Sequence, residues 1–504
     1  MKNQFIDILR TLNKDEVKNL LLFVDSPYFN KSERLIKLFR ELVKIHPDYN
    51  NITSEEIHKR VFPHLEYNDS TMRRLFSDCD KVLKEFLKYV NYEKNAFRVN
   101  EIYREELTGR ALSELQAANT FEMENMFNQN GMFEDLYFLY RSNFEADNSV
   151  FSYINKKLIK TGKVRSEIEN LSNSANYLFI YFLIRNIKLF INIKNYQSLY
   201  STSTNADDIK ATIERIFNLY GEEEIKKYFI IKNYDYSFIY TIYLHLFKAF
   251  AYPNEKGHYF ELKSLLNKNI DKFIIYERQY LVKSLIAYCD VMRNHPDNPK
   301  MKEQFDDELI YLYELTLKKK YYATGASPYL SLNIFRNILI IAINSGKIKW
   351  AQKFIKIYSD KLNPKQKEDA VNYSYGRLHF AQKDYAKALT YFNQLQTNDA
   401  NLRNDEKNMA LIINYELGNF QNLDYLLPAH KKYFKRNTLL SKDRKKFYLT
   451  FNSFLDRLNK LNGYRNFIYI NRFIEDIKAT PTLLYGSWFK EKANELLVER
   501  RKTA

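Results

Sequence analysis

The stretch Val371–Leu395, with the sequence VNYSYGRLHFAQKDYAKALTYFNQL, has the pattern of two antiparallel helices joined by a tight turn. We expect the first helix over Glu368–Phe380, the turn at Lys383–Asp384, and a second helix after it. Gly376 allows the two helices to approach closely, and the small side chain of Ala388 suits their crossing point. Two such helices cannot bury their apolar faces alone, so the pattern predicts further helix pairs stacked against this one.

The flanking sequence repeats this arrangement. Turns predicted at Gly346, Lys383 and Gly418 lie 37 and 35 residues apart, close to the period of about 34 residues in tetratricopeptide (TPR) arrays. We expect Pro364 to close the first of the three units. Any antiparallel helical hairpin tends to place alanine at its crossing and aromatic rings around it, and Asn372 stands where a TPR opens with a large aromatic residue. The predicted fold is therefore an all-α, TPR-like α-solenoid.

The composition favours helices along the whole chain. Only 11 glycines and 10 prolines occur in 504 residues, well below average usage, so architectures of strands and turns lack the residues that punctuate them. Hydrophobic residues make up 45% of the chain and aromatic residues 16%, enough to fill a continuous core along a stack of helices.

Neither a secretory signal nor a membrane-spanning segment is expected. The N-terminal residues lack the apolar run of a signal peptide. The most apolar stretch, Tyr177–Ile193, is interrupted by Arg185 and Lys188 and is shorter than the roughly 20 residues that span a bilayer. The two cysteines, Cys79 and Cys289, have no companions at metal-ligand spacing. These features predict a cytoplasmic protein.

Helix boundaries in the N-terminal region follow from its capping residues. Two stretches have the form of a capping box, Asn13 with Glu16 and Thr53 with Glu56, and each predicts a helix that begins one residue after the cap. We expect Asn30 to cap a third helix over Lys31–Ile45, after the proline of the preceding turn has ended the helix before it.

That turn, Ser26–Glu33 (SPYFNKSE), resembles the opening module of a family of uncharacterised bacterial TPR-like α-helical repeat proteins. The resemblance extends to Phe62–Pro63 and Tyr67–Asp69, and near the other end of the chain to Trp488–Lys492. It covers the whole chain loosely. It implies a helical-repeat fold and brings no established activity.

The N-terminal module also permits a helix-turn-helix interpretation. A helix over Thr53–Val61, a turn at Pro63–Tyr67 and a helix over Asn68–Tyr89 would place Arg73 and Arg74 near the start of a recognition helix. The turn is longer than the usual three or four residues, and Met1–Asn100 has 18 basic and 15 acidic residues, a net charge of only +3. The alternative is a helical cap that covers the end of the solenoid.

Basic residues concentrate at the C-terminal end. The chain has a net charge of +17, and Pro428–Ala504 alone has 18 basic and 7 acidic residues, a net of +11. Interleaved aromatic residues make the densest part a candidate for binding a polyanion or nucleic acid. The alternative is a pair of amphipathic helices with solvated lysines. The candidate residues are Lys431, Lys432, Lys435, Arg436, Arg444, Lys445 and Lys446.

No catalytic or metal-binding motif is present. The eight histidines form no His-Glu-x-x-His pair, and none stands beside a cysteine or serine in a nucleophile motif. We therefore expect no enzymatic activity, no cofactor and no metal.

The predicted function is a non-catalytic scaffold that binds a protein partner on the inner helices of the solenoid. The alternative is a nucleic-acid-binding protein, associated with RNA or acting in transcription, that uses the basic segment or the N-terminal module. We predict four regions, at residues 1–92, 93–327, 328–430 and 431–504. Polar positions on the inner helices are the candidate contacts with a protein partner: Asn333, Asn337, Asn372, Arg377, His379 and Asn414.

Overall fold

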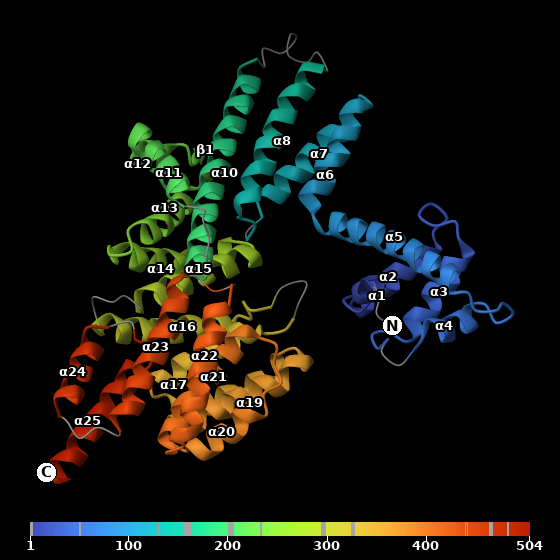
Figure 1. Ribbon diagram of the computed structural model, residues 1–504. Helices are drawn as coiled ribbons and strands as arrows, with labels where there is room; N and C mark the ends of the chain where they lie inside the picture. The colour runs from blue at the N-terminus through green and yellow to red at the C-terminus, as the bar shows by residue number, and fades with distance from the viewer. Residues whose placement is uncertain are drawn as a thin grey trace. The chain divides into compact units, whose positions relative to one another are not determined.

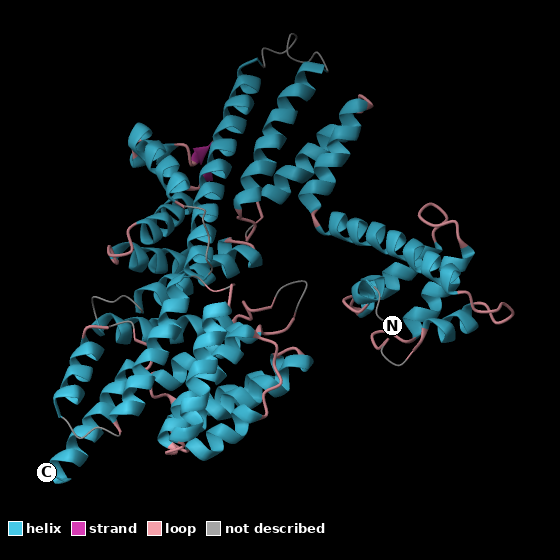
Figure 2. Ribbon diagram, viewed as in Figure 1, coloured by secondary structure: helices cyan, strands magenta, loops and turns pink. Residues whose placement is uncertain are grey.

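The computed structural model is built almost entirely of helices (Figures 1 and 2). It describes residues 4–49, 52–129, 131–154, 164–199, 206–231, 234–293, 299–323, 328–438, 440, 442–462, 467–480 and 483–503. The chain divides into two compact units. Unit 1 comprises Met1–Asn128 and Asn143–Leu171, and unit 2 comprises Gln129–Ser142 and Ser172–Ala504.

Among its described residues unit 1 contains seven complete helices, the second part of an eighth and the first residues of the helix that begins at Val164. The first eight of these are α1 (Gln4–Leu9), α2 (Lys14–Asp25), α3 (Glu33–Lys44), α4 (Ser54–Val61), α5 (Asp69–Lys94), α6 (Ala96–Gly109), α7 (Ser113–Phe127) and α8 (Asp135–Ile154). Helices α1 to α5 enclose one core, in which Phe5, Phe39 and Phe76 are buried and their rings are in contact. Arg104 of α6 is buried and donates to Thr120 of α7 at 2.8 Å.

Unit 2 contains the remaining elements. Its first half has α10 (Val164–Leu199), α11 (Asp207–Tyr220), α12 (Glu222–Lys227), the two-residue strands β1 (Ile230–Ile231) and β2 (Tyr234–Asp235), α13 (Ser237–Ala251), α14 (Gly257–Asn269), the 3₁₀ turn η1 (Ile270–Lys272), α15 (Ile275–Arg293) and α16 (Pro299–Lys318). Its second half has α17 (Leu332–Asn344), α18 (Ile348–Tyr358), η2 (Ser359–Lys361), α19 (Pro364–Ala381), α20 (Tyr385–Asn393), α21 (Ala400–Glu416), α22 (Phe420–Arg436), α23 (Lys442–Leu461), α24 (Phe467–Lys478) and α25 (Gly486–Thr503). The strands form a small antiparallel hairpin.

The helices pack mostly as consecutive pairs. The pairs α13/α14, α15/α16, α17/α18, α19/α20, α21/α22, α22/α23 and α24/α25 in unit 2, and α6/α7 in unit 1, have the most extensive contacts. Short connections force neighbours in sequence to lie antiparallel and to pack on one another. The predicted all-α architecture with sequential helix pairs is confirmed.

The hairpin α19/α20 has the packing that its sequence predicts. A Cβ atom on Gly376 would lie 3.0 Å from the ring of Phe392 on α20, so only glycine lets the two helices come this close. Ala388 is fully buried at the crossing. The three predicted turns are formed by left-handed residues, with φ of 70° at Gly346, 61° at Lys383 and 70° at Gly418.

The capping boxes predicted two helix starts in the N-terminal module correctly. Both capping boxes are formed, and α2 and α4 begin directly after Asn13 and Thr53. The cap predicted at Asn30 is wrong, because Ser32 caps α3. The Asn30 side chain is buried and holds the turn instead: it donates to the carbonyl oxygen of Val24 at 3.0 Å and accepts from the amide of Ser32 at 3.0 Å.

Two other expectations about boundaries are corrected. Pro364 does not close a unit, since it is the first residue of α19, where its missing N–H costs nothing. The predicted division between residues 430 and 431 falls inside α22, which continues through Pro428 to Arg436. No helix in the described part of the chain is long and apolar enough to cross a membrane.

Candidate protein-binding surface

Helix α10 has two apolar faces. One face is fully buried in unit 2 through Ile180, Leu183, Ile184, Ile187 and Phe190. A helix that packs against a core on one side usually turns charged and polar residues to solvent on the other. The opposite face of α10 departs from this rule.

That exposed face carries Leu178, Phe182, Leu189 and Tyr196, whose side chains are 50%, 44%, 40% and 61% exposed. They are 4, 7 and 7 residues apart, which is the spacing of the a and d positions of a coiled coil. Leu178 and Tyr196 are 18 residues apart, so the row runs along one side of the helix for about 27 Å. We call these four residues the α10 apolar row.

Shorter or polar side chains occupy the remaining positions of the same repeat. Arg185 and Asn192 are exposed between the large residues and divide their 7-residue steps into steps of 3 and 4, and the exposed Ala175 lies one 3-residue step before Leu178. The face is thus an uncovered coiled-coil seam with two polar positions. In coiled coils such polar positions fix the register and the identity of the partner at some cost in stability.

Contacts on the buried side hold α10 in place. Phe190 packs against Phe247 of α13 with 5.4 Å between ring centroids. Ser142 of α8 donates to the carbonyl oxygen of Ser174 at 2.9 Å. The Lys188 ammonium lies between two buried carboxylates, 2.8 Å from Asp135 of α8 and 2.6 Å from Glu277 of α15. These contacts tie α10 to α8, α13 and α15 on the side opposite the exposed row.

The charges around Lys188 are matched within unit 2. Burial tends to raise the pKa of Asp135, but Lys188 and Arg185 outweigh it and hold that pKa below its usual value. Tyr243 donates a hydrogen bond to Glu277. Burial, with the negative charges of Asp135 and Glu277, raises the pKa of Glu134 to about 7. Lys188, which pairs with both Asp135 and Glu277, and Arg185, which pairs with Asp135 at 3.0 Å, therefore balance this acidic cluster, which joins α8, α10 and α15.

The six predicted partner contacts do not form one open surface. Arg377 is 7% exposed and donates to the sulfur of Met409 at 3.3 Å. Asn414 is 3% exposed, donates to the carbonyl oxygen of Ala410 at 2.7 Å and accepts from Asn422 at 2.8 Å. Both side chains lie in the packing between helices instead of facing a partner: Arg377 of α19 contacts Met409 of α21, and Asn414 of α21 contacts Asn422 of α22.

The other four are partly accessible. Asn333 is exposed and accepts from Asn401 at 2.9 Å. Asn337 is half-buried and accepts from Arg336 at 3.0 Å. Asn372 is half-buried, and the half-buried imidazole of His379 stacks on the ring of Tyr391 with centroids 5.4 Å apart.

The predicted polyanion-binding residues lie at the end of α22 and the start of α23. Lys431, Lys432, Lys435, Arg436 and Lys446 are exposed, and Arg444 and Lys445 are half-buried. In the N-terminal module Arg73 pairs with Asp69 at 2.7 Å, and seven residues separate α4 from α5.

The α10 apolar row was not predicted from the sequence, because the apolar stretch Tyr177–Ile193 was considered only as a possible membrane-spanning segment. Its signal is present as the 7-residue spacing of Phe182, Leu189 and Tyr196. The apolar residues of the buried face fall between them and mask that period. Comparisons of the chain with protein-family models, curated proteins and solved structures found no match.

Proposed function

We propose that this protein is a non-catalytic scaffold that binds an amphipathic helix of a protein partner along the α10 apolar row. The single observation that carries the proposal is the row itself: four large apolar side chains at heptad spacing, exposed on a helix whose other face is already in a core. An apolar helix face of this kind is the surface that a partner helix covers in helix–helix recognition.

The energetics favour such a contact. Covering the exposed halves of Leu178, Phe182 and Leu189 would contribute roughly 1 kcal/mol each. Since α10 is held rigidly by its buried face and by Lys188, little conformational entropy is lost on the scaffold side. Asn192 within the row would select among partner helices, because its amide favours a polar group opposite it. Arg185 is already paired with Asp135 at 3.0 Å.

The TPR-like solenoid belongs to the same proposal. It is supported by three consecutive hairpins, α17/α18, α19/α20 and α21/α22, by left-handed turn residues 37 and 35 positions apart, and by the contact between Gly376 and Phe392. Stacked hairpins of this type present long helical surfaces that serve as platforms for partners.

Site-specific photo-crosslinking in the native cell tests the proposal. Benzoylphenylalanine placed at Phe182 is expected to capture one specific protein, or a second copy of this chain, through a helical segment identified by mass spectrometry. The matched control places the same group at Tyr425 of α22, which is 77% exposed but stands outside any heptad row.

A second substitution makes the outcome decisive. Leu178→Glu introduces a charge into the seam one turn away from the crosslinker, at a half-exposed position where the fold tolerates it, and is expected to reduce capture at least tenfold. The proposal is wrong if the Phe182 position yields no product beyond that at Tyr425, or if capture is unaffected by Leu178→Glu.

A further inference from the structure

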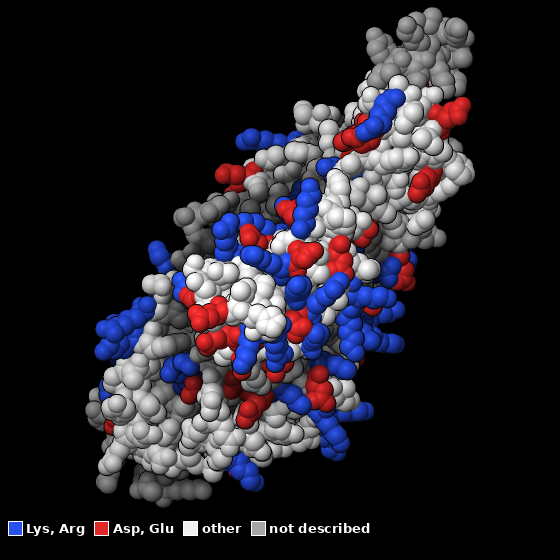
Figure 3. Space-filling view, turned by 90° about the vertical axis from the view of Figure 1, so that its right-hand side faces the viewer, with Lys and Arg blue, Asp and Glu red and all other residues white. Residues whose placement is uncertain are grey.

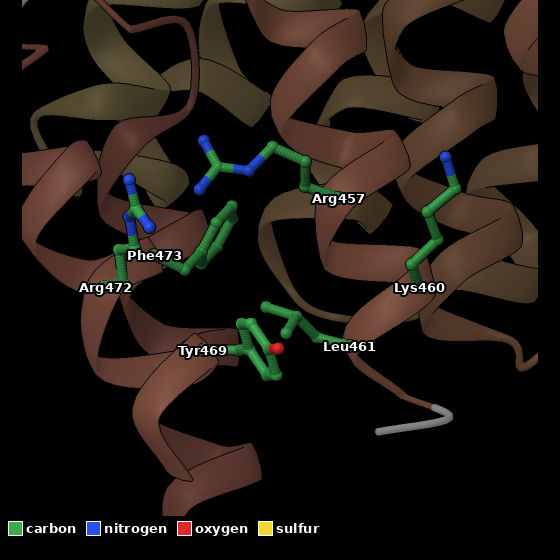
Figure 4. A pocket seen from close by; sticks show the side chains of 6 residues that line it. All are labelled: Arg457, Lys460, Leu461, Tyr469, Arg472 and Phe473. Carbon is green, nitrogen blue, oxygen red and sulfur yellow. The ribbon is translucent and has the colours of Figure 1, made fainter. Parts of the chain in front are cut away.

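Many charged side chains of unit 2 are balanced within the fold. On the face of the protein that Figure 3 shows, basic and acidic side chains are interleaved. In the depression that Figure 4 shows, Arg457 already pairs with Asp476 at 2.6 Å. Two histidines of unit 2 are arranged differently, because their ring nitrogens face each other and offer lone pairs that a metal ion can use.

The two imidazoles meet across the hairpin α13/α14. Nδ1 of His245 lies 3.1 Å from Nδ1 of His258, and both residues are half-buried. His245 lies within α13, and His258 is the second residue of α14. They are 13 residues apart in the chain, which is not the spacing of a metal motif on one helix, so only the packing of the two helices brings them together.

The hydrogen bonds decide which ring nitrogens have a free lone pair. Nε2 of His258 lies 3.2 Å from Oε2 of Glu255, and because a carboxylate only accepts, this nitrogen carries the hydrogen. Nδ1 of His258 is therefore the unprotonated nitrogen of the neutral ring, and His245 donates its Nδ1 hydrogen to it. A histidine whose outer nitrogen donates to a carboxylate is the arrangement that orients metal-binding histidines.

The gap between the two Nδ1 atoms fits a zinc ion in place of the shared hydrogen. Zn–N bonds are about 2.0 to 2.1 Å long, so two nitrogens on one tetrahedral Zn²⁺ lie roughly 3.3 Å apart. The observed separation of 3.1 Å requires only a small rotation of the rings. When the hydrogen of His245 moves from Nδ1 to Nε2, both Nδ1 lone pairs are available to the metal.

Glu261 supplies a third ligand. It lies three residues after His258, so the two share one face of α14, and it is exposed and pairs with no cation that the structure describes. Burial, with the charge of His258, lowers the pKa of His245, and the negative charge of Glu261 acts against this, so its carboxylate lies near the pair. Lys248, one turn along α13, is already paired with Glu222 at 2.7 Å.

The start of α14 is fixed by its packing. Tyr259, the neighbour of His258, is fully buried and stacks on Tyr288 of α15 with 4.9 Å between ring centroids. The Tyr288 hydroxyl donates to the carbonyl oxygen of Pro253, in the connection between α13 and α14, at 2.9 Å. The donor atoms are thus held by rigid elements, as a metal site requires.

We propose that His245, His258 and Glu261 bind one Zn²⁺ ion, with Glu255 orienting His258. Three protein ligands leave the fourth tetrahedral position to water. Two imidazole nitrogens favour Zn²⁺ over Mg²⁺ and Ca²⁺, which take oxygen ligands. The ion joins the two helices of the hairpin α13/α14.

Isothermal titration calorimetry of the chelator-treated, full-length protein with ZnCl₂ tests the site. His245→Gln and His258→Gln are each expected to weaken Zn²⁺ binding about 100-fold or more, because a lost ligand costs at least as much as the roughly 10- to 100-fold of a lost orienting group. Glu255→Gln is expected to weaken binding about tenfold. Glu261→Gln, at an exposed position where the fold tolerates it, is expected to weaken binding at least tenfold.

The matched control is His64→Gln, which removes one imidazole from an exposed position in unit 1 and is expected to change Zn²⁺ binding less than twofold. CoCl₂ provides a second probe, since the visible absorption of Co²⁺ changes when imidazole replaces water, and this change should be lost in His245→Gln. The inference is overturned if the unaltered protein binds no Zn²⁺, if Glu261→Gln and His258→Gln bind it as tightly as the unaltered protein, or if an equal concentration of Ca²⁺ displaces it.

Discussion

At the scale of single residues, Gly376 is the position where side-chain size is most tightly limited. Gly376→Ala places a methyl group 3.0 Å from the Phe392 ring, which must then shift within a packed hairpin. We expect the free energy of unfolding of unit 2 to fall by about 1 to 3 kcal/mol. Urea denaturation measures it.

Gly257→Ala provides the control for helix propensity. Gly257 is the first residue of α14, and a Cβ atom there meets nothing within 4 Å. This substitution is expected to be neutral or slightly stabilising, because alanine narrows the unfolded ensemble. An equal loss from both substitutions would show that the Phe392 contact is not the cause.

His430 makes unit 2 sensitive to acid. Its buried imidazole has one nitrogen 2.8 Å from the amide oxygen of Asn408 and the other 3.2 Å from the amide nitrogen of Asn452, so the neutral ring joins α21, α22 and α23. Burial, helped by the charge of Lys407, lowers the pKa of His430 to about 4. The unfolded chain gains a proton below about pH 6.5, whereas the folded chain resists it down to about pH 4.

The resulting stability is present above pH 6.5 and is lost as the pH falls toward 4. Between pH 7 and pH 4.5 we expect His430 to account for roughly 2 to 3 kcal/mol of the decrease in unfolding free energy. His430→Gln cannot titrate, so its decrease over the same interval should be smaller by that amount. Denaturant curves at the two pH values measure the difference, and identical decreases in both proteins would contradict the assignment.

At the scale of elements, the Lys188 contacts determine how firmly α10 is held. Lys188→Met leaves Glu277 buried without a cation and leaves Asp135 with only the half-exposed Arg185, 3.0 Å away. Losing one partner of such a group typically costs about 3 to 5 kcal/mol. We expect the unfolding free energy of unit 2 to fall by that amount. Capture of a partner by the α10 apolar row should weaken with it, because the platform loosens.

Neutralising the two acids separates charge from packing. In Lys188→Met/Asp135→Asn/Glu277→Gln no unpaired buried charge remains, and we expect at least half of the lost stability to return. If the triple variant is as unstable as Lys188→Met, the ammonium acts through its packing, and the electrostatic account is wrong.

The elements also show which features could be predicted from the sequence. Some features depend only on neighbours within four residues and could therefore be predicted from the local sequence. These are the turns at Gly346, Lys383 and Gly418 and the two capping boxes. Asn30 was misassigned because it and Ser32 both suit a cap, and only the fold shows which of the two is buried. Arg377 and Asn414 were predicted as surface residues because helical spacing alone does not reveal which face the neighbouring helices cover.

The α10 apolar row likewise could not be predicted, because the sequence does not show which face of a helix is exposed. A helix with two apolar faces reads as uniformly apolar, and only burial separates the core face from the exposed row. The basic C-terminal run shows a further limit. The sequence marks its lysines, but Arg457, Tyr469 and Arg472 come together only because α24 packs on α23.

At the scale of the whole molecule, the two cysteines report separately on the two units. Cys79 lies on α5 in unit 1 and Cys289 on α15 in unit 2, and they are the only cysteines of the chain. Both side chains are 0% exposed. Burial raises the pKa of each thiol, so neither reacts with a maleimide until its own unit opens.

Maleimide labelling across a urea series, with each cysteine quantified by mass spectrometry, therefore yields one unfolding curve for each unit. Because each unit has its own core, we expect two distinct midpoints. Gly376→Ala should lower the Cys289 midpoint and leave the Cys79 midpoint unchanged, since Gly376 and Cys289 belong to the same unit. Coincident midpoints that shift together would show that the chain unfolds as one cooperative body, and the stability changes argued above for unit 2 would then apply to the entire protein.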